Sequence, residues 1–502
     1  MTHPLLYEVN ARQWLARLSL KYASTLSLQQ VPEVELEALQ KIGVTHLWLM
    51  GVWPTGSKSR RQAQTHNDLR NAYNEALPDW TEADVLGSPY AVEALQVAQS
   101  LGGDEGLAAL RAKLSTFGIK LILDFVPNHL GLDHPWVTNH PKRFVGGPSS
   151  FADSFPAPTT TEPWFIAHGK DPYFPGWTDT VQLEYRRPET REAMTALVLS
   201  LTQKCDGVRC DMAMLLLSDI FERTWAHVPL EEPRVSGEFW QAAINRVKQE
   251  RPDFLFLAEA YWGLEGRLCE LGFDYAYDKN LYDFVVHDQP QNIQPHLLGL
   301  GVHNAHRAHF LENHDEPRIS TEVSLELHRA AVVLSLGLPG MRFLHDGQLE
   351  GVRRFARVQL ARRADEPVDP SIQTMYAPLL EAFAKSAVGH GEGRLLSPTA
   401  AWEGNPTSLF FTVVLWLDPD SEAQFDLVVV NMASHQSQCR VSLSIPGLSD
   451  KTCILADRIG CETWTRDGVD LVENGLFLDL PARGAQLFSC TLSARTLQPS
   501  AR

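Results

Sequence analysis

Short apolar runs recur along the chain up to residue 347, and each ends in polar residues before a stretch with helical spacing begins. Several runs are apolar at successive positions rather than alternate ones, which is typical of strands buried on both faces of a parallel sheet. One intervening stretch places Leu107, Leu110 and Leu114 at helical spacing, and Gly118 stands where a C-terminal cap belongs. The eight candidate strands are LLYEV (5–9), THLWLMGVW (45–53), IKLILDFV (119–126), DGVRCDM (206–212), DFLFLAEAY (253–261), FDYAY (273–277), AHFLENHD (308–315) and MRFLHDG (341–347).

An alternation of strand and helix repeated about eight times predicts a (β/α)8 barrel, the TIM barrel, within the α/β class. The alternative is an open doubly wound sheet, in which a G-x-G-x-x-G motif would follow an early strand. No such motif follows any early strand of this sequence, and the barrel is therefore the favoured fold.

Two segments interrupt the alternation. Residues 130–185, after the third strand, are rich in Pro, Gly, Ser and aromatic residues and predict an inserted, loop-rich subdomain. After about residue 395 short β-type runs separated by turn residues take over, which predicts a C-terminal antiparallel β-sandwich. The predicted division is a first barrel part (1–129), the insertion (130–185), a second barrel part (186–392), the sandwich (393–495) and a tail (496–502).

Charge and composition narrow the classes of partner. The 502 residues include 44 Lys and Arg against 61 Asp and Glu, a net charge of −17, which disfavours nucleic acid and anionic membrane surfaces. Hydrophobic residues make up 44% and charged residues 21%, as is ordinary for a globular protein. The opening residues MTHPLLYEVNARQW lack the pattern of a signal peptide, and no apolar run of about 18 residues follows. We therefore expect a soluble, cytoplasmic protein with no membrane partner.

Cysteine usage predicts neither a disulfide framework nor a thiolate zinc site. The seven cysteines are an odd number, and none stands in a C-x-x-C pair. We expect reduced thiols with structural roles. Cys210 precedes Asp211 on a strand, so its side chain should face away from the mouth of the barrel.

Polar residues at the ends of the predicted strands carry the candidate chemistry, because the carboxyl ends of barrel strands converge on one face. A single acidic residue at such a position is most often the cap of the next helix. Three carboxylates at the ends of the fourth, fifth and seventh strands would repel one another and lose solvation in one mouth, which indicates a functional site. The candidates are Asp124, Asn128 and His129 (DFVPNH), Arg209 and Asp211 (GVRCD), Glu259 (LAEAY), and Asn313, His314 and Asp315 (ENHD).

These four motifs, in this order and at these strand ends, resemble the four signature regions of the alpha-amylase superfamily of glycoside hydrolases. YEVNARQW near the start and DTVQLEYRRPETR before the fourth strand are also similar to stretches common in that superfamily. The similarity extends from about residue 5 to about residue 350. It implies a retaining enzyme that acts on α-glucosidic bonds of maltooligosaccharides or a small α-glucoside and needs no cofactor.

The resemblance implies a role for each carboxylate. Asp211 is expected to be the nucleophile that forms a glycosyl-enzyme, and Glu259 the acid that protonates the departing oxygen and later acts as the base. Asp315 is expected to hydrogen-bond the 2- and 3-hydroxyls of the sugar. A retaining enzyme places the first two carboxyl groups about 5–5.5 Å apart, one ionised and one protonated.

The resemblance also implies neighbours that bind or support these groups. Arg209, two residues before Asp211 on the same strand, is expected to keep Asp211 ionised, while charged neighbours keep Glu259 protonated. Asp124 and Asn128 are expected to support the site without touching substrate. The expected substrate contacts are Arg209, His129, His314 and Tyr90, the last in GSPYAV after the second strand.

The sequence departs from the family pattern just after the nucleophile. Endo-acting amylases usually carry a Lys-His pair there that serves acceptor subsites and a calcium ligand, whereas DMAML has Met212 and Met214. The insertion also lacks a clear cluster of carboxylates for a hard cation, which needs about six or more oxygens. We expect no metal site, with structural calcium as the less favoured alternative. GSPYAV and DHPWV also resemble the maltosyltransferases that act on maltose phosphate.

Three alternatives to an α-glucoside hydrolase follow from the same residues. Transglycosylation uses the same catalytic groups, so a glucanotransferase or maltosyltransferase-like enzyme is the first. A non-catalytic sugar-binding relative is a remote second, because such relatives lose the acids that this chain retains. A metal-dependent barrel hydrolase using His129, His314 and Asp315 is disfavoured, because these residues do not complete a ligand set. The sequence predicts no oligomeric state. The tryptophans expected beside the sugar site are Trp136, Trp164, Trp177 and Trp262.

Overall fold

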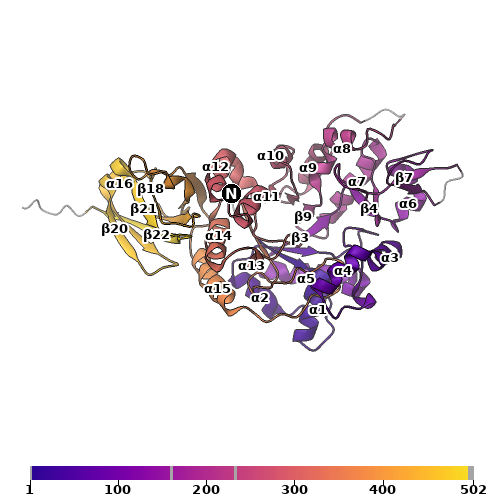
Figure 1. Cartoon of the computed structure of the whole chain (residues 1–502), viewed down its shortest axis with the longest axis horizontal. Helices are drawn as coiled ribbons and strands as arrows, with labels where there is room; N and C mark the ends of the chain where they lie inside the picture. Colours follow the sequence, from indigo (N-terminus) through magenta and orange to yellow (C-terminus); the bar gives the residue numbers. More distant parts are fainter. Residues whose placement is uncertain (1–2, 159–161, 231–234, 496–502) are drawn as a thin grey trace, which may run out of the picture. The chain divides into compact units, whose positions relative to one another are not determined.

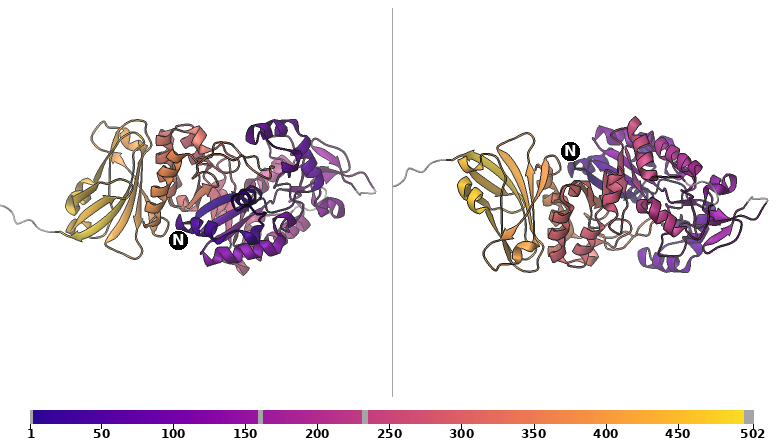
Figure 2. Two further views of the ribbon diagram at one scale, coloured as in Figure 1. Left: turned by 90° about the horizontal axis from the view of Figure 1, so that it is seen from below. Right: turned by 90° about the horizontal axis from the view of Figure 1, so that it is seen from above.

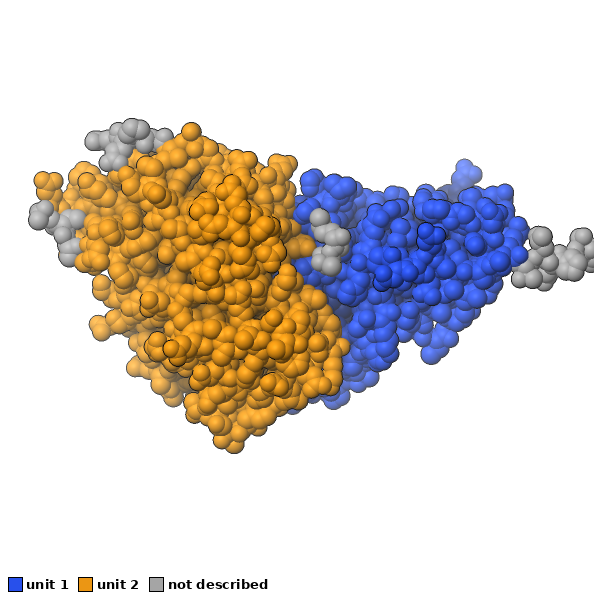
Figure 3. Space-filling view, turned by 180° about the vertical axis from the view of Figure 1, so that it is seen from behind, with its two compact units in different colours: residues 1–6, 278–353, 367–502 blue, residues 7–277, 354–366 orange. Residues whose placement is uncertain are grey.

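The computed structural model describes residues 3–158, 162–230 and 235–495. Contacts between residues divide the chain into two compact units, shown in different colours in Figure 3. One unit contains residues 1–6, 278–353 and 367–502, and the other contains residues 7–277 and 354–366. The predicted tail lies outside the described residues, and the predicted domain boundaries stay predictions.

Eight strands close into a parallel barrel in the order β1-β13-β12-β11-β10-β9-β3-β2 (Figure 1). Each candidate strand of the sequence overlaps one of them, so the predicted (β/α)8 barrel is confirmed. The barrel strands are β1 (Leu5–Asn10), β2 (His46–Met50), β3 (Lys120–Phe125), β9 (Gly207–Cys210), β10 (Leu255–Ala258), β11 (Tyr275–Tyr277), β12 (Arg307–His309) and β13 (Met341–His345).

The unbroken apolar sequence of these strands follows from burial on both faces. Every residue of β2, β9 and β10 is buried, and in β3 only Lys120 is exposed. Gly207 begins β9 where a side chain has no room, because a Cβ there would lie 2.6 Å from the Leu255 carbonyl oxygen and 2.7 Å from Ile122. A central barrel strand is therefore specified by small and apolar residues rather than by alternation.

Three neighbouring strands end at the same level. β3 pairs with β9 so that Asp124 lies opposite Arg209 and Phe125 opposite Cys210. β10 pairs with β9 so that Ala258 also lies opposite Cys210. Because Asp211 and Glu259 directly follow these paired residues, the register brings both carboxyl groups to the carboxyl end of the barrel.

Helices connect the strands, and local sequence sets where several of them begin and end. α7 begins at Pro188. α15 begins after Asp369, whose carboxylate accepts hydrogen bonds from the N–H groups of Ser371 and Ile372. Gly118 follows the end of α5 and has a φ of +70°. The helices are α1 (Ala11–Lys21), α2 (Glu33–Lys41), α3 (Ser57–Thr65), α4 (Asn67–Ala76), α5 (Gly103–Thr116), α6 (Pro135–Asn139), α7 (Pro188–Leu201), α8 (Ser218–Thr224), α9 (Phe239–Glu250), α10 (Glu265–Glu270), α11 (Lys279–Val286), α12 (Pro290–Leu300), α13 (Ile319–Glu322), α14 (Leu325–Gly337), α15 (Pro370–Ala384) and α16 (Gly468–Asn474).

The insertion after the third strand contains α6 and two small sheets. One sheet pairs β4 with β8, and the other has the order β5-β7-β6. An insertion after the third strand was expected, and none of the strands within it exceeds three residues. They are β4 (His129–Gly131), β5 (Gly146–Gly147), β6 (Ser154–Pro156), β7 (Phe165–Ala167) and β8 (Thr180–Gln182).

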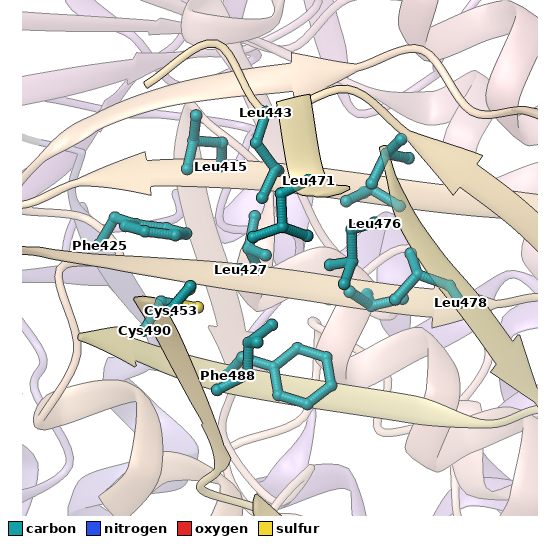
Figure 4. Close-up of a cluster of buried hydrophobic side chains, with 14 of the residues drawn as sticks. Leu415, Phe425, Leu427, Leu443, Cys453, Leu471, Leu476, Leu478, Phe488 and Cys490 are labelled. Carbon is teal, nitrogen blue, oxygen red and sulfur yellow. The ribbon is translucent and has the colours of Figure 1, made fainter. Parts of the chain in front are cut away.

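The C-terminal region forms the predicted antiparallel β-sandwich, whose strands are coloured orange to yellow in Figure 2. A six-stranded sheet, β14-β16-β17-β22-β19-β20, faces a three-stranded sheet, β15-β18-β21, across a core of leucines, phenylalanines and cysteines (Figure 4). The strands are β14 (Glu392–Leu396), β15 (Thr399–Ala400), β16 (Phe411–Leu417), β17 (Gln424–Asn431), β18 (Ser437–Val441), β19 (Lys451–Asp457), β20 (Thr463–Asp467), β21 (Leu476–Leu480) and β22 (Ala485–Ala494).

The larger sheet is covered on its second face by α14, which contacts β17 and β22 within the same unit. Gly337 at the end of α14 permits this approach, because a Cβ there would lie 2.4 Å from a methyl group of Val428. Trp416 of β16 donates from its indole nitrogen to the Gly337 carbonyl at 2.9 Å. These contacts explain why β16 and β17 are buried at nearly every position.

All seven cysteines lie among the described residues and none is paired in a disulfide. Five of them, including Cys210, are buried, whereas Cys461 is exposed and so departs from the expected structural role. In the part of the chain that the structure describes, no helix combines the length and apolar character needed to cross a membrane.

Candidate active site

Arg209 lies at the centre of the candidate site in the unit that contains residues 7–277. Its side chain is fully buried, and the nitrogen Nη1 donates to Asp211 Oδ1 at 2.9 Å. The second nitrogen, Nη2, lies 2.7 Å from Glu259 Oε2. The structure therefore brings the carboxyl groups of Asp211 and Glu259 onto one buried guanidinium group.

Asp124 supports this guanidinium from the neighbouring strand. Its Oδ1 lies 3.6 Å from Arg209 Nη1, and its backbone carbonyl accepts from Trp53 Nε1 at 2.9 Å. Burial alone would lower the pKa of Arg209, but the charge of Glu259 and other neighbours raises it well above its ordinary value. Arg209 thus stays cationic and offsets the charge of the carboxylates around it.

Three aromatic rings surround the same guanidinium. Its central carbon lies 5.1 Å from the ring centre of Trp48, 5.3 Å from that of Tyr90 and 5.8 Å from that of Tyr277. The Tyr277 hydroxyl also accepts from Arg209 Nε at 3.3 Å. Tyr90 was expected here, whereas Trp48 and Tyr277 were missed. Tyr277 ends β11, so the rule that selected polar residues at strand ends would have found it.

Two hydrogen-bond donors contact Glu259 besides the Arg209 guanidinium. Its Oε2 accepts from the Met212 backbone N–H at 2.6 Å, and its Oε1 accepts from the Tyr261 hydroxyl at 2.8 Å. Met212 has a φ of +44°, a left-handed conformation that is uncommon for a residue with a long side chain. The strained backbone after Asp211 thus turns an N–H group toward the second carboxyl group. Neither contact was predicted, because the sequence pattern gives no backbone conformation.

His129 begins β4 close to the loop that carries Tyr90. Burial lowers the pKa of His129 to about 3, although a hydrogen bond to the Tyr90 backbone raises it slightly, so the imidazole is neutral at pH 7. The ring packs against Trp177 at 5.0 Å between ring centres. The neighbouring Asn128 amide oxygen accepts from Gln182 Nε2 at 2.9 Å, which joins β4 to β8 and fixes the histidine in place.

In the other unit, the segment after β12 carries His314 and Asp315. His314 Nε2 lies 3.0 Å from Asp315 Oδ2, and the Asp315 side chain is 45% exposed. Asn313, which is buried, accepts through Oδ1 from the N–H groups of Asp315 at 2.9 Å and Glu316 at 3.0 Å. This Asx turn fixes the backbone that carries the Asp315 side chain.

A buried ionic network that the sequence analysis missed anchors the same segment. Glu312 Oε1 accepts from Arg318 Nη1 at 2.7 Å, and Oε2 accepts from the Ile319 N–H at 2.8 Å. Arg318 also donates to the Asp346 carbonyl at 2.8 Å. Burial alone would raise the pKa of Glu312, but Arg318 and His345 lower it to about 2. The available signal was Glu312 itself, a charged residue inside the apolar start of the FLENHD motif.

The four tryptophans expected near the sugar site have different surroundings. Trp177 packs on His129, whereas Trp136 lies under the Arg143 guanidinium at 4.3 Å and Trp164 lies over Gly146. Trp262 is 43% exposed and packs edge to face on Tyr173. Among residues 3–158, 162–230 and 235–495, no three His, Cys, Asp or Glu side chains are grouped as ligands for a metal ion.

Comparison with known proteins gives one family match. The model of the alpha-amylase catalytic domain matches residues 33–374. Alpha-amylase 3 of Dictyoglomus thermophilum is 22% identical over 342 residues, which cover 63% of this chain and 59% of that protein. An alpha-1,4-glucan:maltose-1-phosphate maltosyltransferase of Rhodospirillum rubrum is 27% identical over 251 residues, 48% of this chain and 30% of that protein. The chain thus spans only part of the length of these relatives.

Solved structures share the fold over nearly the whole chain. A maltogenic alpha-amylase from Thermotoga neapolitana superposes with a TM-score of 0.65 at 18% identity, covering 98% of this chain and 99% of the other. An alpha-amylase from Geobacillus thermoleovorans in complex with acarbose has a TM-score of 0.64 at 17% identity, again covering 98% and 99%. At these identities the likeness concerns the fold.

Proposed function

The chain belongs to the alpha-amylase family, and from this premise we propose that it cleaves α-glucosidic bonds of maltooligosaccharides or small α-glucosides with retention of configuration. The observation that supports the proposal most is the buried Arg209 guanidinium, which contacts the carboxyl groups of both Asp211 and Glu259. Two carboxyl groups on adjoining strand ends are what a double displacement at an anomeric carbon requires.

Asp211 attacks the anomeric carbon in the proposed first step. Arg209 holds Asp211 Oδ1 at 2.9 Å, which fixes the carboxylate and favours its ionised form. The attack forms a glycosyl ester and breaks the bond to the departing oxygen, which takes a proton from Glu259. In the second step Glu259 removes a proton from water, which attacks the same carbon and releases Asp211.

Tyr261 offers Glu259 a way to hold its proton. The Tyr261 hydroxyl lies 2.8 Å from Glu259 Oε1 and can donate to the carboxylate or accept from the carboxylic acid. The Met212 N–H and Arg209 occupy the other oxygen, Oε2. In the proposed mechanism the transferable proton therefore resides on Oε1.

Asp315 is proposed to bind the 2- and 3-hydroxyls of the same sugar, and His314 and His129 to donate further hydrogen bonds. These roles rest on the family motifs that contain the three residues. His129 suits the role, because a neutral imidazole can donate to a hydroxyl from one nitrogen and accept at the other.

Replacing the proposed nucleophile tests the function directly. We expect Asp211→Asn to lower kcat on maltooligosaccharides and on α-glucosyl fluoride by about 10⁴-fold or more, because the covalent step is lost. Asp253→Asn, at an exposed position with a side chain 66% accessible, is the matched control and should retain activity. Proton NMR of the first product should show the α-anomer. Full activity of Asp211→Asn, or release of the β-anomer, would contradict the proposal.

Transfer to a sugar acceptor is the second candidate reaction, because four of the similar curated proteins are maltosyltransferases. Both reactions use the same glycosyl-enzyme, and only the attacking hydroxyl differs. Products longer than the substrate, formed from a panel of maltooligosaccharides and separated by size, would identify transfer. Products that are all shorter would identify hydrolysis.

A further inference from the structure

Arg12, the second residue of α1, is a buried cation that the proposed mechanism does not use. The residue is 7% exposed and belongs to the YEVNARQW segment. Its Nη1 donates to the Gly87 carbonyl at 3.0 Å, and its Nη2 donates to the Trp53 carbonyl at 3.2 Å and to the Thr55 hydroxyl at 3.0 Å. These three acceptors are all neutral, whereas a buried arginine is normally paired with a carboxylate.

The burial of this charge is costly for folding. Desolvation and, to a lesser extent, the charge of Arg60 lower the pKa of Arg12 to about 10, so the side chain is still cationic at pH 7. An apolar side chain of similar length would avoid the cost of desolvation but would leave buried acceptors without a donor. Since such costly features concentrate at functional sites, the hydrogen bonds of Arg12 indicate a role for the loops that they join.

Arg12 fixes two consecutive carbonyl groups of one loop, those of Gly87 and Ser88. The Gly87 carbonyl accepts from the guanidinium directly. The Thr55 hydroxyl accepts from the guanidinium and donates in turn to the Ser88 carbonyl at 2.9 Å. The loop lies close against Thr55, because a Cβ at Gly87 would be 2.7 Å from the Thr55 methyl group. Arg12 thus holds the loop at its base.

The next residues of the loop form a turn that contains Tyr90. The Ala91 N–H donates to the Ser88 carbonyl at 3.1 Å. Pro89 and Tyr90 are therefore the central residues of the turn, and the proline ring fixes φ at the first of them. The position of Tyr90 thus depends on the Ser88 carbonyl, which the relay from Arg12 holds.

Tyr90 in turn contacts two groups of the candidate site. Its ring centre lies 5.3 Å from the central carbon of the Arg209 guanidinium, and its backbone shares a hydrogen bond with His129. A shift of the turn would therefore move the aromatic ring away from the guanidinium that Asp211 and Glu259 share.

We propose that Arg12 is a positioning residue that acts on the reaction through Tyr90. It fixes the loop of residues 87–91, and the loop keeps the Tyr90 ring beside Arg209, where the ring lines the site of the attacked sugar. A lysine could not take its place, because an ammonium group is a compact donor that does not span three separate acceptors as a planar guanidinium does. The inference rests on the proposed function and adds a residue that supports the site.

A double-mutant cycle tests whether the effect of Arg12 passes through Tyr90. We expect Arg12→Met to lower kcat/KM on α-glucosyl fluoride about 10- to 100-fold, because a displaced ring no longer supports the attacked sugar. Arg12→Lys should restore little of this loss. In the Tyr90→Ala background, Arg12→Met should change kcat/KM by less than about twofold. Losses that multiply independently would overturn the proposal.

Two further variants distinguish positioning from general stability. Thr55→Val removes the hydrogen bond to the Ser88 carbonyl but keeps the side-chain shape, so we expect a smaller loss that also disappears in the Tyr90→Ala background. If Arg12→Met does not fold, Thr55→Val decides between the two outcomes.

Arg342→Met is the matched control. Arg342 is likewise buried, burial likewise lowers its pKa to about 10, and it donates to a carbonyl, that of His3, in the other unit. The control should lower the free energy of unfolding without coupling to Tyr90. Coupling to Tyr90 as strong as that of Arg12 would contradict the proposal.

The position of Tyr90 can also be measured without turnover. Incorporation of 3-fluorotyrosine labels the 11 tyrosines, and Tyr90→Phe identifies the ¹⁹F resonance of Tyr90. We expect that resonance to shift in Arg12→Met and Thr55→Val and to stay in place in Arg342→Met. A shift in a chain that turns over no α-glucoside would support the positioning role and refute the proposed function alone. An unmoved resonance, together with normal turnover by the unaltered chain, would refute the positioning role alone.

Discussion

At the scale of single residues, the candidate site depends on how the Arg209 guanidinium and a few hydrogen-bond donors are shared among the neighbouring carboxyl groups. Arg209 contacts three carboxyl groups, those of Asp211, Glu259 and Asp124, and stays cationic although it is fully buried. Glu259 has a hydroxyl neighbour, Tyr261, that can accept a hydrogen bond as well as donate one. This neighbour supports the proposed acid role of Glu259.

Glu259→Gln tests the acid role through the choice of leaving group. The amide cannot supply a proton, so we expect kcat on maltooligosaccharides to fall about 10²–10⁴-fold. The loss should be much smaller for formation of the glycosyl-enzyme from α-glucosyl fluoride, because fluoride departs without protonation. Burst kinetics with the fluoride measure that step. Glu270→Gln, at an exposed position in α10, is the control. Equal losses on both substrates would argue against the acid role.

At the scale of elements, the loop after β12 shows what the sequence predicts and what it leaves out. Its motif, FLENHD, was predicted to place His314 and Asp315 at a strand end, but β12 ends at His309 and both residues lie in the loop that follows. The Glu312–Arg318 pair that closes the loop was missed, because an ion pair across six residues outside a helix leaves no periodic signal. The barrel strands were predictable from their unbroken apolar runs. The edge strand β20 has no such run, because exposed residues alternate along it.

Glu312→Gln tests whether this pair holds the loop. The folded pKa of Glu312, about 2, lies below its ordinary value of 4.5, so its stabilisation is present above pH 4.5 and is lost as the pH falls toward 2. We expect the substitution to lower the free energy of unfolding by about 3 kcal/mol at pH 7 and by progressively less below pH 4.5. Urea unfolding across this pH range measures the difference. Glu473→Gln, at an exposed position, is the control, and a difference that does not vary with pH would contradict the assignment.

At the scale of the whole molecule, five buried histidines contribute to the response to acid. Burial lowers the pKa to about 4 for four of them and to about 3 for His129, against an ordinary value of 6.5. Each imidazole is neutral in the folded chain at pH 7. As the pH falls, the unfolded chain binds a proton at this imidazole at a higher pH than the folded chain does. The other four are His3, His46, His134 and His328.

We expect the contribution of these histidines to the free energy of unfolding to be constant above about pH 7. Between pH 6.5 and pH 4 their protonation should lower the free energy of unfolding. Since the folded pKa values are lowered, the unfolded chain binds more protons in this window, and each histidine costs up to about 1.4 kcal/mol per pH unit. Urea unfolding at half-unit steps of pH gives the slope. His46→Gln should reduce the slope of the free energy of unfolding against pH by the contribution of one proton, about 1.4 kcal/mol per pH unit. A free energy that stays level down to pH 4 would contradict this account.

The hydrogen bonds of the first described residues have a consequence for synthesis on the ribosome. The Arg342 N–H donates to the Pro4 carbonyl, the Gly340 N–H donates to His3 Nδ1, and the His3 N–H donates to the Gly389 carbonyl. At about 5–20 residues per second, roughly 20–80 s separate the emergence of these residues from that of their partners. The edge of β1 that pairs with β13 must wait that long for its partner, a period in which a chaperone that shields an unpaired strand edge would raise the yield of folded chain.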